Sequence, residues 1–198
     1  RLNAPAGMEA AEFAALRAAA LNAMGESAVA RALVQDVDGG NYTPALSEAA
    51  RQAYLATGDV LGMCPVLKLQ PVADAAADTG SNAAQGGEWE LQRAICTAYE
   101  GEARSADRRL QRALGTGTAP EIDVRLAQRY AGAAADGGRA VNIEWDGVGE
   151  MTPWRFALAR ALGVDIPPAL LEGGGYDLPT VLIPATPLAL RAAAAERA

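Results

Sequence analysis

The two cysteines are the residues of this chain with the clearest capacity for chemistry. Cys64 lies in GMCPVL and Cys96 lies in LQRAICTAYE. The chain contains no histidine, so neither thiol has the general base that usually activates a nucleophile. The same absence excludes a Ser-His-Asp triad and a typical zinc site. The cysteines do not form a CxxC pair, and we therefore expect a structural role for both.

That structural role is either a disulfide or a pair of buried, reduced thiols. The cysteines fall on two neighbouring predicted helices with a flexible stretch between them, which suits a covalent link in an oxidising compartment. Closing a loop of about 30 residues would stabilise the fold by about 3 to 4 kcal/mol in the chain-entropy account. We predict a disulfide between Cys64 and Cys96, with reduced thiols as the alternative.

The segment QDVDGGNYT places Asp36, Asp38 and Asn41 beside glycines, a composition found in calcium loops. An EF-hand loop needs glycine at its sixth position and an acid at its twelfth. Counting from Asp36, these positions hold Asn41 and Ser47. We therefore interpret the segment as a turn, and we predict no metal and no cofactor.

A second acidic segment, EWDGVGEMTPW, carries Glu144, Asp146 and Glu150 beside Trp145 and Trp154. Paired carboxylates next to tryptophan are one arrangement of a glycosidase site. The simpler interpretation is a loop whose acids favour the N-terminus of the next helix, with the tryptophans packed between helices. We predict no catalytic residue and no enzymatic activity.

Four arginines gather on one predicted helix, in EARSADRRLQR, and are interleaved with two acids: Arg104, Arg108, Arg109, Arg112, Glu102 and Asp107. The default interpretation is a solvated face with i, i+4 ion pairs. A stripe that binds a partner is the alternative. The net charge of −7 argues against a nucleic-acid partner, because phosphate binding needs a basic surface.

The elements that position these residues are predicted to be helices. The composition is 51% hydrophobic, but much of this is alanine, the best helix former, and β-branched and aromatic residues are sparse. Thr-Pro pairs predict helix caps at Thr43, Thr152 and Thr186. Gly58 and Gly163 predict the ends of the first two of these helices.

Periodicity and breakers predict the remaining elements. In the first helix, Met8, Phe13, Leu16 and Leu21 fall near one stripe. Residues 139–146 are ambiguous between helix and extended chain, and no stretch is long enough to span a membrane. The predicted helices are 8–23, 26–36, 43–58, 65–69, 71–78, 88–100, 102–114, 120–135 and 152–162, with one further turn in IPPALLEGGG and a last helix from Thr186.

The clear helix starts recur at intervals of about 32 to 34 residues, the length of a helix–turn–helix repeat. We predict N-terminal hairpins over 1–79, a flexible linker over 80–87 and repeat-like hairpins over 88–198. The hairpin at 88–114 resembles a tetratricopeptide unit in its second helix, through Gly101, Ala106, Leu110 and Ala113. The small Ala106 would let two helices approach, and Leu110 would fill the gap between them.

This resemblance implies an α-solenoid of stacked antiparallel hairpins. LQRAICTAYEGEARSAD and WRFALARALGVDIP are also similar to exported helical-repeat proteins of α-proteobacteria, which implies a periplasmic or secreted bacterial protein. Because the chain starts at Arg1 and ends in a helical pattern, we expect a longer native chain.

The functional prediction is a non-enzymatic scaffold or adaptor subunit of a cell-envelope assembly. Its partners would be other protein subunits, in a homo- or hetero-oligomer, because solenoids present extended surfaces to proteins. One alternative is the non-catalytic superhelical domain of an enzyme similar to lytic transglycosylases. Another is a small-molecule enzyme that uses carboxylates alone.

Overall fold

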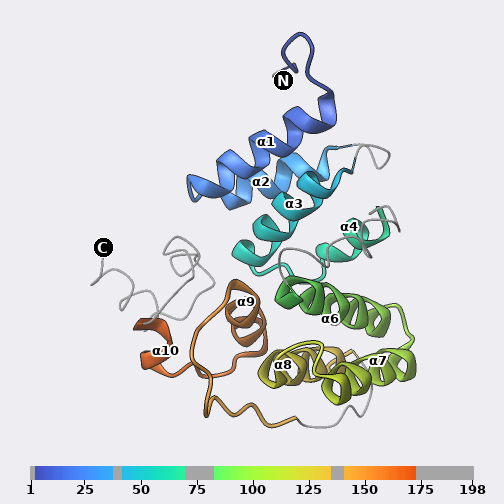
Figure 1. Ribbon diagram of the computed structural model, residues 1–198, viewed down its shortest axis with the longest axis vertical. Helices are drawn as coiled ribbons and strands as arrows, with labels where there is room; N and C mark the ends of the chain where they lie inside the picture. Colours follow the sequence, from blue (N-terminus) through green and yellow to red (C-terminus); the bar gives the residue numbers. More distant parts are fainter. Residues whose placement is uncertain (1–2, 38–41, 70–82, 135–140, 173–198) are drawn as a thin grey trace.

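The computed structural model describes residues 3–37, 42–69, 83–134 and 141–172. In these ranges every regular element is a helix, which confirms the predicted all-α class. Figure 1 shows the helices, which are α1 (Ala10–Ala23), α2 (Ser27–Gln35), α3 (Pro44–Thr57), α4 (Met63–Leu69), α6 (Ala83–Tyr99), α7 (Ala103–Thr116), α8 (Glu121–Gly132), α9 (Pro153–Leu162) and α10 (Pro168–Glu172).

The first three helices form a cluster with its own core. Each of α1, α2 and α3 contacts the other two, and all three lie at the top of Figure 1. The core of this cluster includes the small side chain of Ala18 together with Val34 and Leu46. Asn22 Nδ2 donates a hydrogen bond of 2.8 Å to the carbonyl oxygen of Ala49, so a buried polar contact also ties α1 to α3.

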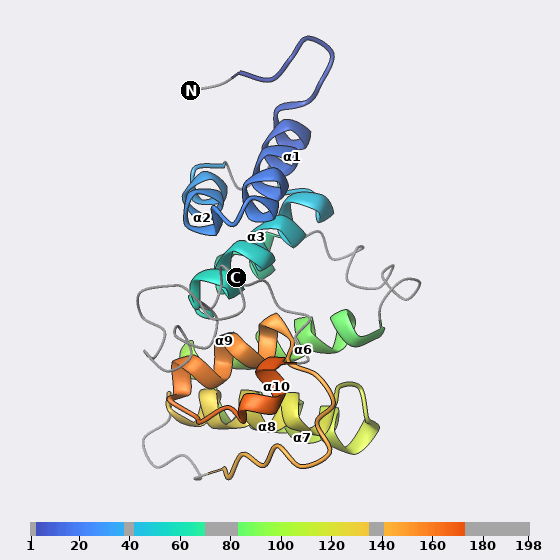
Figure 2. The same cartoon turned by 90° about the vertical axis from the view of Figure 1, so that its left-hand side faces the viewer.

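The second cluster contains α6, α7, α8 and α9. α6 contacts both α7 and α8, and α8 contacts α9. Larger side chains fill this core, including Leu126 and Phe156, which are fully buried. A buried ion pair links α8 to α9, because Arg155 Nε lies 2.7 Å from Asp123 Oδ1. In both views of the molecule this cluster lies below the first (Figures 1 and 2).

The two clusters meet through α3, α4 and α9. α4 contacts α3 and α6, and α3 contacts α9. Arg160 Nη2, on α9, donates to the carbonyl oxygen of Thr57 at the end of α3, at 3.1 Å. A Cβ atom at Gly58 would lie 1.6 Å from that nitrogen. Glycine at this position therefore allows both the left-handed turn and the approach of the guanidinium.

The predicted caps at Thr43 and Thr152 are confirmed. Each threonine Oγ1 accepts a 3.2 Å hydrogen bond from the backbone N–H three residues later. The two helices end at the predicted glycines, Gly58 and Gly163, both in the left-handed conformation. The third predicted cap, Thr186, lies outside the described residues.

Part of the predicted linker is helical instead. We expected flexible chain over 80–87, but α6 begins at Ala83. Gly87 is buried, and a Cβ atom there would lie 2.5 Å from the carbonyl oxygen of Thr118 and 3.1 Å from the Cβ atom of Ala119. Glycine at 87 therefore serves the close approach of α6 to the α7–α8 connection.

The residues of the tetratricopeptide resemblance lie on the α6–α7 hairpin. Ala106, Leu110 and Ala113 are buried on α7, and Gly101 forms the turn with φ of +93°. α6, α7 and α8 all contact one another. These contacts are compatible with one helical hairpin packed against the first helix of a second hairpin. However, residues 141–151 after α8 are not helical, so the stacked solenoid stays a prediction.

Candidate protein-binding surfaces

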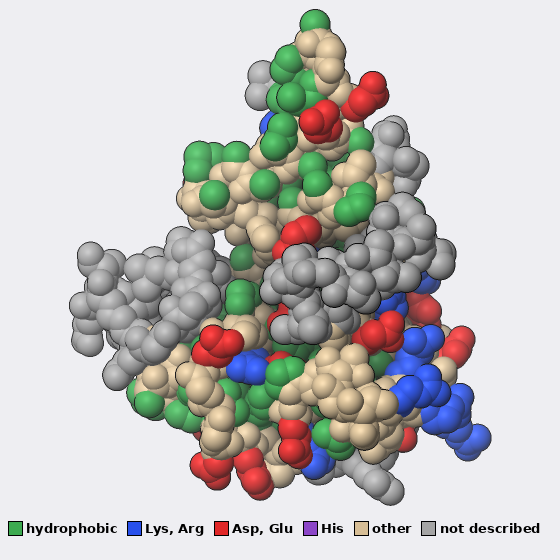
Figure 3. All heavy atoms as spheres, viewed as in Figure 1, with side chains coloured by type: hydrophobic (Ala, Val, Ile, Leu, Met, Phe, Trp, Pro, Cys, Tyr) green, Lys and Arg blue, Asp and Glu red, His purple; other side chains and the backbone are tan. Residues whose placement is uncertain are grey.

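The first candidate surface is a row of apolar side chains on α1 that faces solvent. The row consists of Leu16, Ala19, Ala20, Ala23 and Met24, all of them exposed. Their i, i+3, i+4, i+7, i+8 spacing aligns side chains along one face of a helix. Leu16 and Met24 are 54% and 67% exposed, and Figure 3 shows apolar side chains over this part of the surface. We call these five residues the outer row of α1.

Of the four residues that fall near one stripe in the sequence, Leu16 is exposed, so this stripe is not a fully packed face. The face of α1 that packs against α2 and α3 instead carries Ala15, Ala18 and Asn22. Small side chains let three helices approach closely, so the alanines occupy the inner face and the larger Leu16 faces outward. As a result α1 is apolar on both faces, whereas a surface helix is normally apolar on one.

The second candidate surface includes a row of arginines on α7. Arg104, Arg108 and Arg112 are exposed at i, i+4, i+8 spacing. α7 contains four arginines and one aspartate, although the whole chain has a net charge of −7. The described residues form no ion pair or hydrogen bond with the guanidinium groups of this row. The predicted pattern of i, i+4 ion pairs is therefore absent from this face of the described structure.

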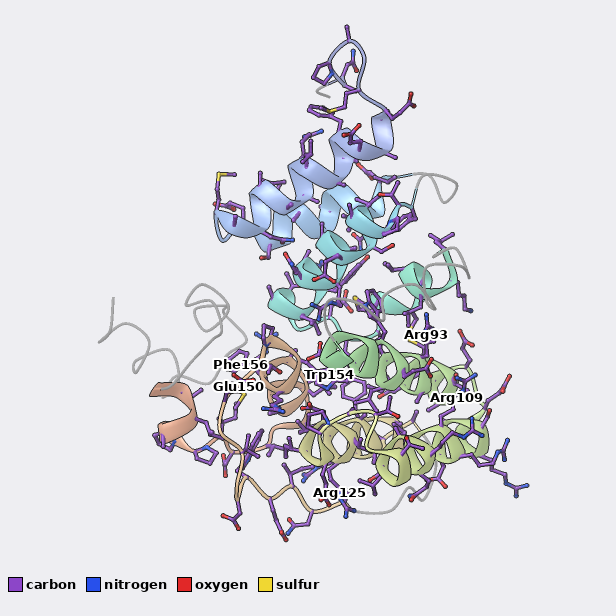
Figure 4. All side chains as sticks on the ribbon, viewed as in Figure 1. Arg93, Arg109, Arg125, Glu150, Trp154 and Phe156 are labelled. Atoms are coloured by element: carbon purple, nitrogen blue, oxygen red, sulfur yellow. A yellow bond between two sulfur atoms is a disulfide. The ribbon has the colours of Figure 1, made fainter. Side chains whose placement is uncertain are left out.

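The fourth arginine of α7 has a different environment. Arg109 Nη1 lies 3.5 Å from Glu90 Oε2, and Arg93 Nη1 lies 3.0 Å from Glu90 Oε1. Figure 4 shows Arg93 and Arg109 on the same side of the molecule, on α6 and α7. Glu90 therefore lies between two arginines, and Arg109 supports the α6–α7 contact.

An open groove borders the arginine row. It has a volume of about 1120 Å³ and lies between α7, α8 and the segment 141–149. α7 contributes Arg104 and Arg108 to its lining, and the segment contributes Glu144 and Asp146. Small-molecule pockets usually measure about 300 to 1000 Å³. The size of the groove and its charged sides therefore suit a macromolecular segment better than a small molecule.

The segment 141–145 has the alternation of an extended chain. Val141, Ile143 and Trp145 are half-buried, whereas Asn142 and Glu144 are exposed. Side chains alternate in this way because successive residues of an extended chain point to opposite sides. The sequence left 139–146 undecided between helix and extended chain. The described part is not helical: Val141 to Trp145 show the alternation of an extended chain, and Asp146 lies in a turn.

The carboxylates near the tryptophans are not arranged as a buried acid pair. Glu144, Asp146 and Glu150 are all exposed. Trp154 is buried in the core, and Trp145 Nε1 donates a 2.9 Å hydrogen bond to the backbone of the connection that precedes α10. The geometry favours the loop interpretation of this segment. Figure 4 shows Trp154 and Glu150 at different places around α9.

No protein-family model, curated protein or solved structure matches this chain. Among the described residues, no helix is long and apolar enough to cross a membrane. The same residues include no group of three His, Cys, Asp or Glu side chains that could hold a metal ion. In the acidic segment that we interpret as a turn, Asp36 follows the end of α2. Asp38 and Asn41 lie outside the described residues.

The cysteines lie at disulfide distance. The Sγ atoms of Cys64, on α4, and Cys96, on α6, are 2.06 Å apart, and their Cα atoms are 5.5 Å apart. This geometry fits the predicted disulfide, which would link the short α4 to the second cluster. Cys96 is 6% exposed, so its sulfur is also poorly placed to act as a nucleophile.

A buried charge cluster lies where α3 meets α6. Arg51 Nη1 donates to Glu88 Oε2 at 2.9 Å, and Arg51 Nε and Nη2 donate to the two oxygens of Glu48 at 2.8 Å. One guanidinium therefore faces two carboxylates. Burial raises the pKa of Glu88 to about 7, against the attraction of Arg51 and with further repulsion from Asp123 and Glu48. Burial lowers the pKa of Arg51, but its two carboxylates raise it by more.

Two buried atoms beside Glu88 lack a hydrogen-bond partner within the described structure, namely Gln92 Oε1 and Trp154 Nε1. Both side chains line a small internal space with Arg51 and Glu88. Glu88 and Gln92 are four residues apart on α6, which places them on the same helix face. A protonated Glu88 has an O–H group that can donate a hydrogen bond to Gln92 Oε1, whereas an ionised carboxylate has no donor. Trp154 Nε1 is a donor that either form of Glu88 can accept from, so only the Gln92 oxygen distinguishes the two forms.

Sequence reasoning missed the outer row of α1 and the buried Glu88. The spacing of the outer row is legible in the sequence, but it competes with the alanines of the inner face. Glu88 gave no signal, because Arg51 lies 37 residues away along the chain and only the fold brings the two together.

Proposed function

We propose that this chain is a non-enzymatic scaffold or adaptor subunit that binds other proteins within a bacterial cell-envelope assembly. The observation that carries the proposal is the outer row of α1, because Leu16 and Met24 are more than half exposed. The inner face of α1 already packs against α2 and α3. A second apolar row on the same helix is therefore available to another molecule.

The chemistry of the outer row suits a partner helix. Three alanines lie between Leu16 and Met24 in the row, and small side chains allow two helices to approach closely. From Leu16 to Met24 the row spans eight residue steps, or about 12 Å of helix. An amphipathic partner helix would contact such a row with its own i, i+3, i+4, i+7 side chains.

A scaffold needs more than one contact surface, and the groove beside α7 provides the second. α1 and α7 lie toward opposite ends of the long axis in Figure 1. The two surfaces also differ in chemistry, since one is an apolar helix face and the other is a groove with charged sides. Partners bound at these surfaces would therefore be held apart by the two helical clusters.

The cysteine pair supports the proposed location. Disulfides form and persist mainly in oxidising compartments such as the bacterial periplasm. A cysteine pair at disulfide distance, Cys64 and Cys96, is compatible with such a compartment. We place the chain in the periplasm or outside the cell as part of the proposal.

Photo-crosslinking in the native bacterium tests the proposal at the outer row. A benzophenone amino acid at Ala20, introduced into the full native chain, should give a crosslinked product of defined mass. The mass would distinguish a second copy of the chain from a different protein. The substitutions Leu16→Ser and Met24→Ser together should abolish the product, because they remove the largest apolar side chains of the row.

A benzophenone at Gln52 is the matched control, because Gln52 is exposed on α3 but lies outside the outer row. We expect little product from this position. Equal products from Ala20 and Gln52, or a product that survives the double substitution, would show that the outer row binds no specific partner.

A further inference from the structure

We propose that the groove beside α7 binds an extended segment of a partner protein in which acidic and basic residues alternate. The inference rests on the proposed scaffold function and gives the chemistry of the partner at the second surface. It is carried by the charges on the two sides of the groove and by the spacing of the arginines on α7.

The α7 side of the groove is basic. Arg104 and Arg108 line it, and Asp107 is the acid that α7 adds to the lining. Arg104 and Arg108 are one helical turn apart, or about 6 Å along the axis. Like charges at this spacing repel each other, and they have no ion-pair partner among the described residues. Carboxylates from a bound segment would relieve this repulsion, and arginine can bind each of them with two hydrogen bonds.

The side formed by the segment 141–149 is acidic. Glu144 and Asp146 line the groove and are exposed. Glu144 Oε1 accepts a 3.0 Å hydrogen bond from Asn142 Nδ2, and no cation among the described residues pairs with it. After Trp145 the chain turns, and Val148 N–H donates to the carbonyl oxygen of Trp145 at 3.1 Å. This side therefore presents two carboxylates at the point where the segment turns.

Two other arginines that line the groove already have a carboxylate partner. Arg125 Nη2, which also lines the groove, lies 3.0 Å from Glu121 Oε1. Arg155 is paired with the buried Asp123 at 2.7 Å. Figure 4 shows Arg125 at the edge of α8 that faces away from α6. The charges left to recognise a partner are therefore Arg104, Arg108 and Asp107 on α7 and the carboxylates of 141–149.

An extended peptide matches both sides at once. Its successive side chains point in opposite directions, and those on one side repeat every two residues, or about 6.8 Å. Acidic residues at alternate positions would face Arg104 and Arg108, and the basic residues between them would face Glu144 and Asp146. A polyanion such as a nucleic acid would meet repulsion from these two carboxylates.

Two labelled octapeptides test the pattern directly, fluorescein-(Glu-Lys)4 and fluorescein-(Glu-Glu-Lys-Lys)2. Both peptide sequences have the same composition and balanced acidic and basic side chains, so nonspecific attraction to this acidic chain is equal. Peptides of this length do not hold a stable helix in water. We expect fluorescence anisotropy with the full 198-residue chain to show about tenfold tighter binding of the alternating peptide, since several exposed ion pairs act together.

Variants on each side of the groove identify the site. Arg104→Gln with Arg108→Gln, and separately Glu144→Gln with Asp146→Asn, should each weaken binding of the alternating peptide about tenfold. The control is Glu12→Gln with Arg17→Gln on α1, which removes one charge of each sign elsewhere and should leave binding unchanged.

Equal affinity for the two peptides would overturn the proposal, as would an equal loss in the α1 control or the absence of binding at millimolar peptide. None of these outcomes affects the crosslinking at Ala20. A failure at the groove is therefore distinguishable from a failure of the scaffold function.

Discussion

At the scale of single residues, Glu88 on α6 links the two clusters through its contact with Arg51 on α3. Burial disfavours the ionised form of its carboxyl. It is the more buried of the two carboxylates around Arg51, with 15% of its side chain exposed against 35% for Glu48. Gln92 Oε1 beside it has no donor among the described residues. Proton uptake by Glu88 therefore reduces the excess negative charge and supplies a donor in the same place.

The substitution Glu88→Gln should change how stability depends on pH. The pKa of Glu88 is raised from 4.5 to about 7, so the folded protein binds a proton that the unfolded chain releases in this interval. The stability linked to that proton is complete below about pH 4.5 and is lost as the pH rises through about 7. We expect the free energy of unfolding of the wild type to fall across this interval, and that of the variant to fall less.

Urea unfolding at several values between about pH 5 and about pH 8 measures this difference. Burial also raises the pKa of Asp123, but Asp123 is present in both proteins, so the comparison isolates Glu88. Equal pH slopes in the two proteins would show that Glu88 does not carry the effect.

Substitution of two helical glycines by alanine should change the stability of the fold in opposite directions. Gly87→Ala places a Cβ atom 2.5 Å from the carbonyl oxygen of Thr118, and we expect a loss of about 1 to 3 kcal/mol through overpacking. Gly115→Ala on α7 meets nothing within 4 Å and should add about 0.5 to 1 kcal/mol through helix propensity. Thermal unfolding of the two variants compares them, and a loss of similar size in both would refute the contact at Gly87.

At the scale of elements, α4 is tied into the fold by its covalent link to α6. α4 has seven residues, which is too short for a helix to be stable alone. Its buried residues Met63 and Val66 contribute to the first core, whereas Cys64 reaches Cys96 on α6. The cysteine pair therefore connects an element of one cluster to the other.

Replacement of both cysteines by alanine should destabilise the protein by about 3 to 4 kcal/mol, because a closed loop restricts the unfolded chain. The sequence separation across the pair is 32 residues. Urea unfolding with and without a reducing agent should separate the oxidised and reduced wild type, and the double variant should not respond to reduction. A titration that finds two free thiols in the native chain would exclude the disulfide.

The helix ends show what the sequence can and cannot predict. The caps at Thr43 and Thr152 depend on side chains within the same few residues, so local reasoning was sufficient. The start of α6 depends on a contact between Gly87 and the distant Thr118. In the sequence alone, the same glycine predicts a flexible linker. The two faces of α1 could not be told apart either, because alanine gives little contrast between inside and outside.

The candidate surfaces were predictable to different degrees for the same reason. The arginines of α7 are visible as a cluster in the sequence, and a partner-binding stripe was one of the two interpretations. The groove was not predictable, because it depends on how α7, α8 and the segment 141–149 come together in space.

At the scale of the whole molecule, two helical clusters separate two surfaces of different chemistry. α1 presents an apolar row toward one end (Figure 3), and the groove with oppositely charged sides lies beside α7, toward the other end (Figure 1). Such a shape favours a chain that connects partners over one that encloses a substrate. The proposed scaffold function therefore depends most on whether the outer row of α1 is covered in the native assembly.

Sedimentation velocity of the native complex, isolated through a tag on this chain from its source organism, tests this most directly. The wild type should sediment as a larger species that contains its partner. The variant with Leu16→Ser and Met24→Ser should sediment as the free chain while its helical circular dichroism stays unchanged. A wild type that sediments as the free chain, or a variant that keeps the larger species, would contradict the scaffold function.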